Sequence, residues 1–281
     1  MRLTLVAICL YMIFGYRANA QNNSATSIST PISQTAAKKE KPFTLALDLS
    51  IDSNLKDQSQ SDYSSTLALR VIPALRISSK AKIKADFTLE QKNYADKSSE
   101  VTDTAIILER DAIDLRPDLT VKPNIFGVIP TNEPNRNDNS FQGGAGLGAI
   151  FDLKIDSLGE QATLTYAPSF LQNFYEFESN NNLEANLSYR IRHNLAFLQP
   201  LGNGFSLELF GRYQTGWTYT NALRTIFILY ESLKYDISEN AAVYLQHTNQ
   251  ANALRANGVD SNVRLYDDST STFAIGLEAS L

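Results

Sequence analysis

Side chains that commonly carry catalysis or bind metals are scarce in this sequence, which holds two histidines and one cysteine. Cys9 lies within an N-terminal apolar run. His193 has no cysteine or second histidine near it in the sequence, so we interpret it as an interfacial residue and predict no metal site and no cofactor. His247 is the one candidate for a catalytic residue. A histidine can remove a proton from a hydroxyl nucleophile, provided that the fold places the two together.

The segments that would position these residues alternate between apolar and polar residues with a period of two. Between Phe205 and Trp217, apolar residues and glycine alternate with polar and charged ones. Successive side chains of a strand point to opposite faces, so this stretch is predicted to be a strand with one apolar and one polar side. The pattern recurs from Phe43 almost to Leu281. It predicts an all-β chain.

The N-terminus has the features of a secretory signal. Arg2 is followed by a short apolar run, and Ala18 to Ala20 form a small-x-small cleavage site. Residues 1–20 are therefore predicted to be a signal peptide. Residues 21–41, rich in Ser, Thr, Ala and Asn, are predicted to be a flexible extension, and residues 42–281 a single β-domain.

Short turns and longer polar loops alternate along this domain, as they do in outer-membrane barrels. Short turns fall near residues 78–80, 156–159, 200–204 and 238–240. The direction of each strand then requires one more crossing at residues 118–128. This stretch is either a strand, despite Pro123, or a plug that returns through the lumen. The strand reading predicts a closed antiparallel up-and-down transmembrane β-barrel of about twelve strands.

In such a barrel the apolar face meets lipid and the polar face lines the interior. Two readings of the interior stay open: a salt-bridged seal, or a water-filled lumen whose charges filter solutes. The residues predicted to line the lumen are Arg70, Arg76, Lys82, Lys84, Asp86, Glu90, Glu184, Arg190, Arg192, Glu208, Arg212 and Arg224.

The last strand alternates to its end and resembles the closing strand of Gram-negative outer-membrane proteins. The resemblance implies that Phe273–Leu281 is recognised by the barrel-assembly machinery. The final residue is Leu281, where those proteins usually carry an aromatic residue. The chain is similar to porins in general character. This implies an outer-membrane location, contact with outer-membrane lipid, and either passage of small solutes or a structural role. The alternative of a secreted soluble β-sandwich stays open.

The stretch from Gln246 to Ala253 is faintly similar to the motif of outer-membrane lipid A deacylases and phospholipases. Those enzymes carry a histidine and, two residues later, a serine on the lipid-facing side. Here Asn249 stands at the second position, and Thr248 is predicted to point inward. A lipid-modifying hydrolase using His247 is therefore the alternative function. The net charge of −5 argues against a nucleic-acid partner.

Overall fold

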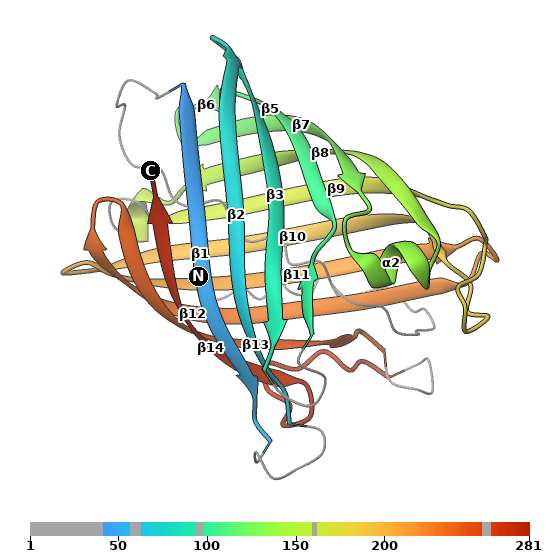
Figure 1. Ribbon diagram of the computed structural model, residues 1–281. Helices are drawn as coiled ribbons and strands as arrows, with labels where there is room; N and C mark the ends of the chain where they lie inside the picture. Colours follow the sequence, from blue (N-terminus) through green and yellow to red (C-terminus); the bar gives the residue numbers. More distant parts are fainter. Residues whose placement is uncertain (1–41, 57–62, 94–97, 159–161, 255–259) are drawn as a thin grey trace.

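The computed structural model describes residues 42–56, 63–93, 98–158, 162–254 and 260–281. These residues form one closed antiparallel β-barrel with a short helix, α2 (Glu133–Asn137), at one end (Figure 1). The sequence predictions for residues 1–20 and 21–41 fall outside the described residues. Among the described residues, no helix is both long and apolar enough to span a membrane.

The strands are long and are joined in sequence order around the barrel. Their bounds are β1 (Phe43–Asn54), β2 (Ser65–Ser78), β3 (Ala81–Lys92), β4 (Ser99–Val101), β5 (Thr104–Arg110), β6 (Ile113–Arg116), β7 (Leu119–Ile129), β8 (Phe141–Lys154), β9 (Thr163–Tyr175), β10 (Leu187–Gly202), β11 (Phe205–Thr218), β12 (Leu223–Ser238), β13 (Ala241–Asn252) and β14 (Ser271–Ser280).

The barrel closes where β1 meets β14. Leu47 of β1 pairs with Ala279 of β14 on one side and with Val71 of β2 on the other. The segments β4, β5 and β6 together occupy one place in the wall, because β4 and β5 pair with β3 while β6 pairs with β7. The wall therefore has twelve strands, which confirms the predicted all-β barrel.

The proline-containing stretch forms a strand of the wall and not a plug. Strand β7 pairs with β5 and β6 on one side and with β8 on the other. Pairing with β5 ends at Asn124, and pairing with β6 resumes at Val121. Pro123 thus lies opposite the break between β5 and β6, where its missing N–H group leaves no ladder bond unmade. The alternation of apolar and polar residues in the sequence also slips at this break, from Glu109 to Asp111.

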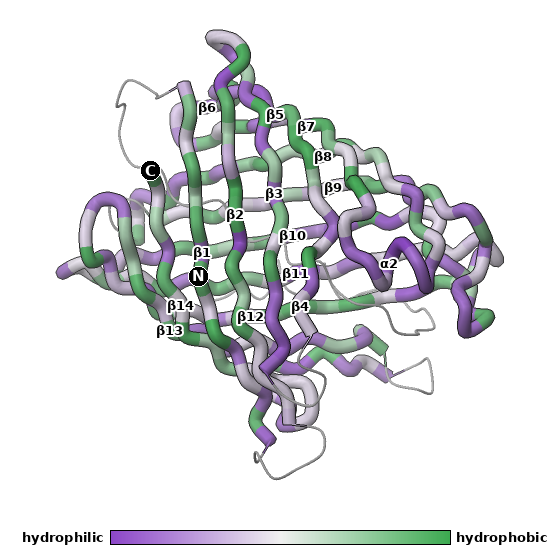
Figure 2. Tube along the Cα trace, in the orientation of Figure 1, coloured by the Kyte–Doolittle hydropathy of each residue, from purple (hydrophilic) through white to green (hydrophobic). Residues whose placement is uncertain are grey.

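Hydrophobic and hydrophilic residues alternate along the strands, as the hydropathy colours of the chain trace show (Figure 2), and large apolar side chains are exposed on the wall. Leu147 and Ile275 are 60% and 63% exposed, whereas Arg192 and Arg212 are 5% and 4% exposed. A soluble protein buries the first kind of residue and exposes the second. The inverted pattern is that of a barrel whose outer face meets hydrocarbon.

Tight hairpins lie at one end of the barrel and longer connections at the other. The β10–β11 hairpin turns at Gly202, Asn203 and Gly204, which have φ values of 90°, 53° and 81°. Glycine adopts this left-handed region without the steric cost of a Cβ. At the opposite end the connection between β7 and β8 contains α2, whose N-cap Asn132 accepts a hydrogen bond from the Asn135 backbone N–H at 2.8 Å.

Candidate channel lumen

The charged side chains gather on the concave face of the wall. Lys234 of β12 forms an ion pair of 2.7 Å with Glu278 of β14, reaching across β13. Two strands that are not neighbours approach each other in this way only on the inside of a curved sheet. Tyr244 of β13 likewise donates a hydrogen bond of 2.8 Å to Asp48 of β1. The polar residues of alternate positions therefore face the lumen.

One side of the lumen, on β2, β3 and β5, is neutralised by ion pairs. Arg70 binds Asp86 through two nitrogens, at 2.7 and 2.5 Å. Glu109 is almost completely buried and binds both Lys82, at 3.1 Å, and Lys84, at 2.7 Å. Paired charges of this kind tie neighbouring strands together and largely offset one another.

The glutamate shared by two lysines is the most heavily charged contact of this side. Replacing Glu109 by Gln should lower the free energy of unfolding by about 1–3 kcal/mol, because two largely buried ammonium groups lose their counter-charge. The unfolding midpoint in urea, followed by the heat-modifiable shift on gels, measures this. Replacement of Glu178, which is exposed in a loop, by Gln is the matched control. Equal midpoints for the two variants would contradict the assignment.

The other side of the lumen, on β10 to β12, carries what we call the arginine cluster: Arg190, Arg192, Arg212 and Arg224. The Nε–H of Arg192 donates to the amide oxygen of Gln214 at 2.7 Å. The Nε–H of Arg212 donates to the amide oxygen of Asn194, also at 2.7 Å. Each bond joins residues directly opposite in the β10–β11 register. Neutral amides thus orient these two guanidinium groups.

The positive charges of the arginine cluster lie close to one another. Arg190 and Arg212 both lie close enough to Arg192 to repel it. Among the described residues, neither Arg190 nor Arg192 forms an ion pair with a carboxylate, and the Nε of Arg190 is buried without a hydrogen-bond partner. The positive charge of Arg190 and Arg192, which no carboxylate of the described residues pairs, is therefore expected to attract anions.

One lumen residue escaped sequence reasoning because it is apolar on a polar face. Phe210 points inward between Glu208 and Arg212 and is only 6% exposed. Its ring stacks on Tyr230 with centroids 4.6 Å apart, and the guanidinium carbon of Arg212 lies 5.6 Å from its centroid. Ala196 and Ile228 complete a small apolar patch beside the arginine cluster. The sequence signal for this patch is a phenylalanine at a position of the strand where its neighbours on the same face, Glu208 and Arg212, are charged.

Eleven of the twelve residues predicted to line the lumen lie on wall strands β2, β3 and β10 to β12, at inward positions of their alternation. Glu184 does not. It is exposed in the loop before β10, because that strand begins only at Leu187. Leu183 has a φ of 62° and is 87% exposed, so the chain is turning there and not extended.

His247 lies on the outer face of β13, next to Glu231 of β12. Its Nδ1 is 2.8 Å from the Glu231 carboxylate, and its ring packs against Tyr266 and Phe273. The Nε2 atom is buried and has no hydrogen-bond partner, so no hydroxyl among the described residues is placed for activation. The structure thus adds an acidic partner that sequence reasoning missed but supplies no nucleophile. The described residues contain no group of three or more His, Cys, Asp or Glu side chains arranged to hold a metal ion.

His193 also faces outward, on β10, where its Nδ1 lies 2.7 Å from the Tyr166 hydroxyl. Aromatic rings extend this surface toward the end with the longer loops. Tyr189 stacks on Trp217 with centroids 4.9 Å apart, and Phe170 lies beside Tyr189. Such a belt suits the headgroup region of a membrane.

No protein-family model matches this sequence, and no curated protein matches it. Solved structures do resemble its fold. An outer-membrane channel from Pseudomonas putida F1 is similar with a TM-score of 0.60 and 11% identity, over 90% of this chain and 100% of that one. The NanC porin is similar with a TM-score of 0.53 and 12% identity, over 84% of this chain and 100% of that one. The fold is therefore that of an outer-membrane β-barrel, porin-like in general character.

Proposed function

We propose that this protein is an outer-membrane channel that passes small solutes and favours anions. One observation carries the proposal: Arg190 and Arg192 of β10, which form no ion pair with a carboxylate among the described residues, face a wall whose charges are largely paired. Solutes crossing at this level meet the positive charge of Arg190 and Arg192 from one side. Rings of charged side chains at a constriction are a common basis of ion selectivity.

The membrane placement rests on three supports. The outside of the wall is apolar, aromatic rings flank the loop end, and Phe205 and Tyr235 pack together at the hairpin end, with centroids 4.7 Å apart. The predicted signal peptide at residues 1–20 would direct export. Recognition of Phe273–Leu281 by the barrel-assembly machinery stays a prediction. In the structure this segment includes β14, the strand that closes the barrel against β1.

The test is conductance of the refolded protein in a planar lipid bilayer. Discrete channel openings are expected, with a reversal potential in a KCl gradient that shows preference for chloride over potassium. Heat-modifiable migration on gels establishes that the barrel is folded in the same preparation. A folded, stably inserted protein that conducts nothing would refute the channel and favour a structural barrel. A freely soluble protein would refute the membrane placement as well.

A second candidate function is lipid hydrolysis at His247, favoured by the carboxylate of Glu231 at its Nδ1. A carboxylate in this position orients an imidazole and stabilises its protonated form. Release of fatty acid from phospholipid or lipid A vesicles by the purified protein, abolished by His247→Ala, would establish it. Equal release by both proteins at the level of empty vesicles would remove it.

A further inference from the structure

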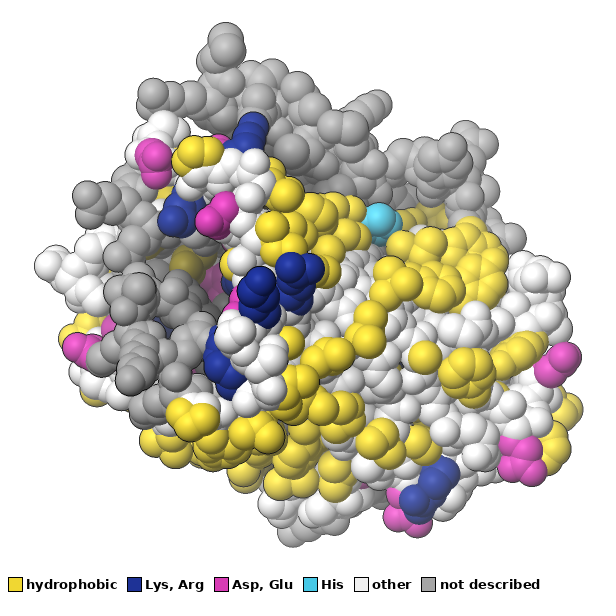
Figure 3. All heavy atoms as spheres, turned by 90° about the horizontal axis from the view of Figure 1, so that it is seen from above, with side chains coloured by type: hydrophobic (Ala, Val, Ile, Leu, Met, Phe, Trp, Pro, Cys, Tyr) yellow, Lys and Arg dark blue, Asp and Glu magenta, His cyan; other side chains and the backbone are white. Residues whose placement is uncertain are grey.

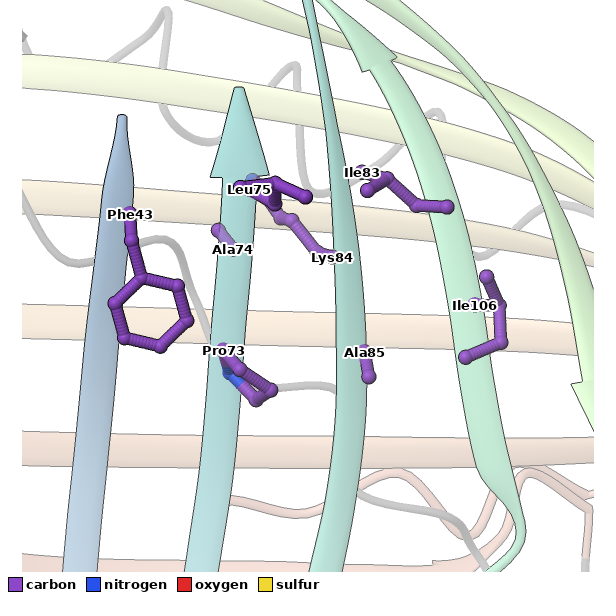
Figure 4. A pocket seen from close by; sticks show the side chains of 8 residues that line it. All are labelled: Phe43, Pro73, Ala74, Leu75, Ile83, Lys84, Ala85 and Ile106. Atoms are coloured by element: carbon purple, nitrogen blue, oxygen red, sulfur yellow. The ribbon is translucent and has the colours of Figure 1, made fainter. Parts of the chain in front are cut away.

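The barrel wall contains a groove that is lined mostly by outward-facing residues and partly by inward-facing ones. It has a volume of about 210 Å³ and lies over β1, β2, β3 and β5 near the hairpin end (Figure 4). Phe43, Leu75, Ile83 and Ile106 line it from outward positions. The inward residue Lys84 also reaches it. The lining is therefore almost entirely apolar, with the stem of one lysine behind it.

The groove has a local cause in Pro73. The β2–β3 ladder pairs Val71 with Phe87 and resumes only at Ala74 with Lys84. Proline has no N–H group to donate, so the two strands separate over the intervening residues. The gap between them becomes the floor of the groove, and the flanking apolar side chains form its sides.

Basic side chains lie at the rim below this groove. Lys80 is in the β2–β3 turn, and Arg110 ends β5 directly opposite Ala81. That register places Arg110 on the outer face. Ile83, which lines the groove, is two residues along β3 from Ala81, a distance of about 7 Å. Among the described residues neither side chain has an ion-pair partner. The view onto this end shows Lys and Arg side chains beside an apolar surface (Figure 3).

We propose that this groove and rim bind one anionic glycerophospholipid. An acyl chain lies in the groove against Pro73 and Ile83, and the phosphate receives charge-assisted hydrogen bonds from Lys80 and Arg110. The inference rests on the proposed membrane placement but not on conduction. Two features make this site differ from unspecific contact with bilayer lipid. The groove holds an acyl chain, and Lys80 and Arg110, which have no ion-pair partner among the described residues, lie within reach of the headgroup.

Native mass spectrometry of the full chain, refolded in non-ionic detergent, tests the site. Phosphatidylglycerol and phosphatidylcholine with identical acyl chains are titrated separately. One retained phosphatidylglycerol adduct is expected, about tenfold stronger than that of phosphatidylcholine. The double variant Lys80→Gln and Arg110→Gln should lower phosphatidylglycerol binding about tenfold, and Ala85→Phe, which fills the groove from the outside, should lower binding of both lipids.

Arg116→Gln is the matched control, because Arg116 lies at the next hairpin of the same rim and is already paired with Asp118 at 3.2 Å. Equal adducts of both lipids on every variant would overturn the proposal and indicate unspecific lipid contact. A stable dimer in place of a lipid adduct would overturn it in favour of a second copy of the chain. A silent channel that still retains the phosphatidylglycerol adduct would refute the proposed conduction alone. A conducting channel without the adduct would refute this inference alone.

Discussion

Replacing Arg192 and Arg212 together by glutamine should lower the chloride-over-potassium permeability ratio about tenfold. Two unit charges about 4 Å from a passing ion each contribute roughly 1 kcal/mol even in bulk water, and salt screens part of this. A tenfold change corresponds to about 1.4 kcal/mol. Glutamine keeps a donor for the amides of Gln214 and Asn194, so the local hydrogen bonds are weakened but not lost.

The measurement is the reversal potential of single channels in a KCl gradient, repeated at low and high ionic strength. The difference between wild type and variant should shrink as salt rises. Arg110→Gln is the control for charge outside the lumen, because it removes one arginine charge from the outer face of the wall. An unchanged permeability ratio in the double variant would show that the arginine cluster does not govern selectivity. An equal shift in Arg110→Gln would show that only overall charge matters.

The architecture could be predicted because barrel geometry imposes strict rules on sequence. Alternation defines strands, hairpin asymmetry defines their directions, and an even count forced the stretch with Pro123 into the wall as β7. The structure adds why this proline is tolerated: the neighbouring strand is broken opposite it. No local propensity contains that information, since it depends on two separate strands being irregular at the same height.

The arrangement inside the lumen was less predictable, because it depends on register and on curvature. Alternation places Lys234 and Glu278 on one face, but their ion pair requires the wall to curve across β13. Assigning faces by residue type also passes over Phe210, which is inward and apolar. Glu184 was predicted to line the lumen and does not, because the alternating pattern begins in the sequence before the backbone of β10 becomes extended.

The tightest fit between two lumen positions is that of Tyr244 over Gly276. The two residues are directly opposite in the β13–β14 register, and a Cβ built on Gly276 would lie only 2.2 Å from the Tyr244 ring. An aromatic ring lying over a cross-strand glycine covers its exposed backbone. Gly276→Ala should therefore displace the ring and its hydrogen bond to Asp48. We expect a loss of about 1–3 kcal/mol in the free energy of unfolding.

Gly276→Ala should cost much less in the Tyr244→Ala background, because the three atoms nearest to the new methyl group all belong to Tyr244. Urea unfolding of the wild type, both single variants and the double variant forms a double-mutant cycle, with an expected coupling of more than about 1 kcal/mol. Gly211→Ala is the control, since its Cβ would meet only the end of Leu229 at 3.4 Å. Additive effects would mean that the ring does not occupy the space above Gly276. The pairing of β13 with β14 would then depend on their backbone ladder and not on this contact.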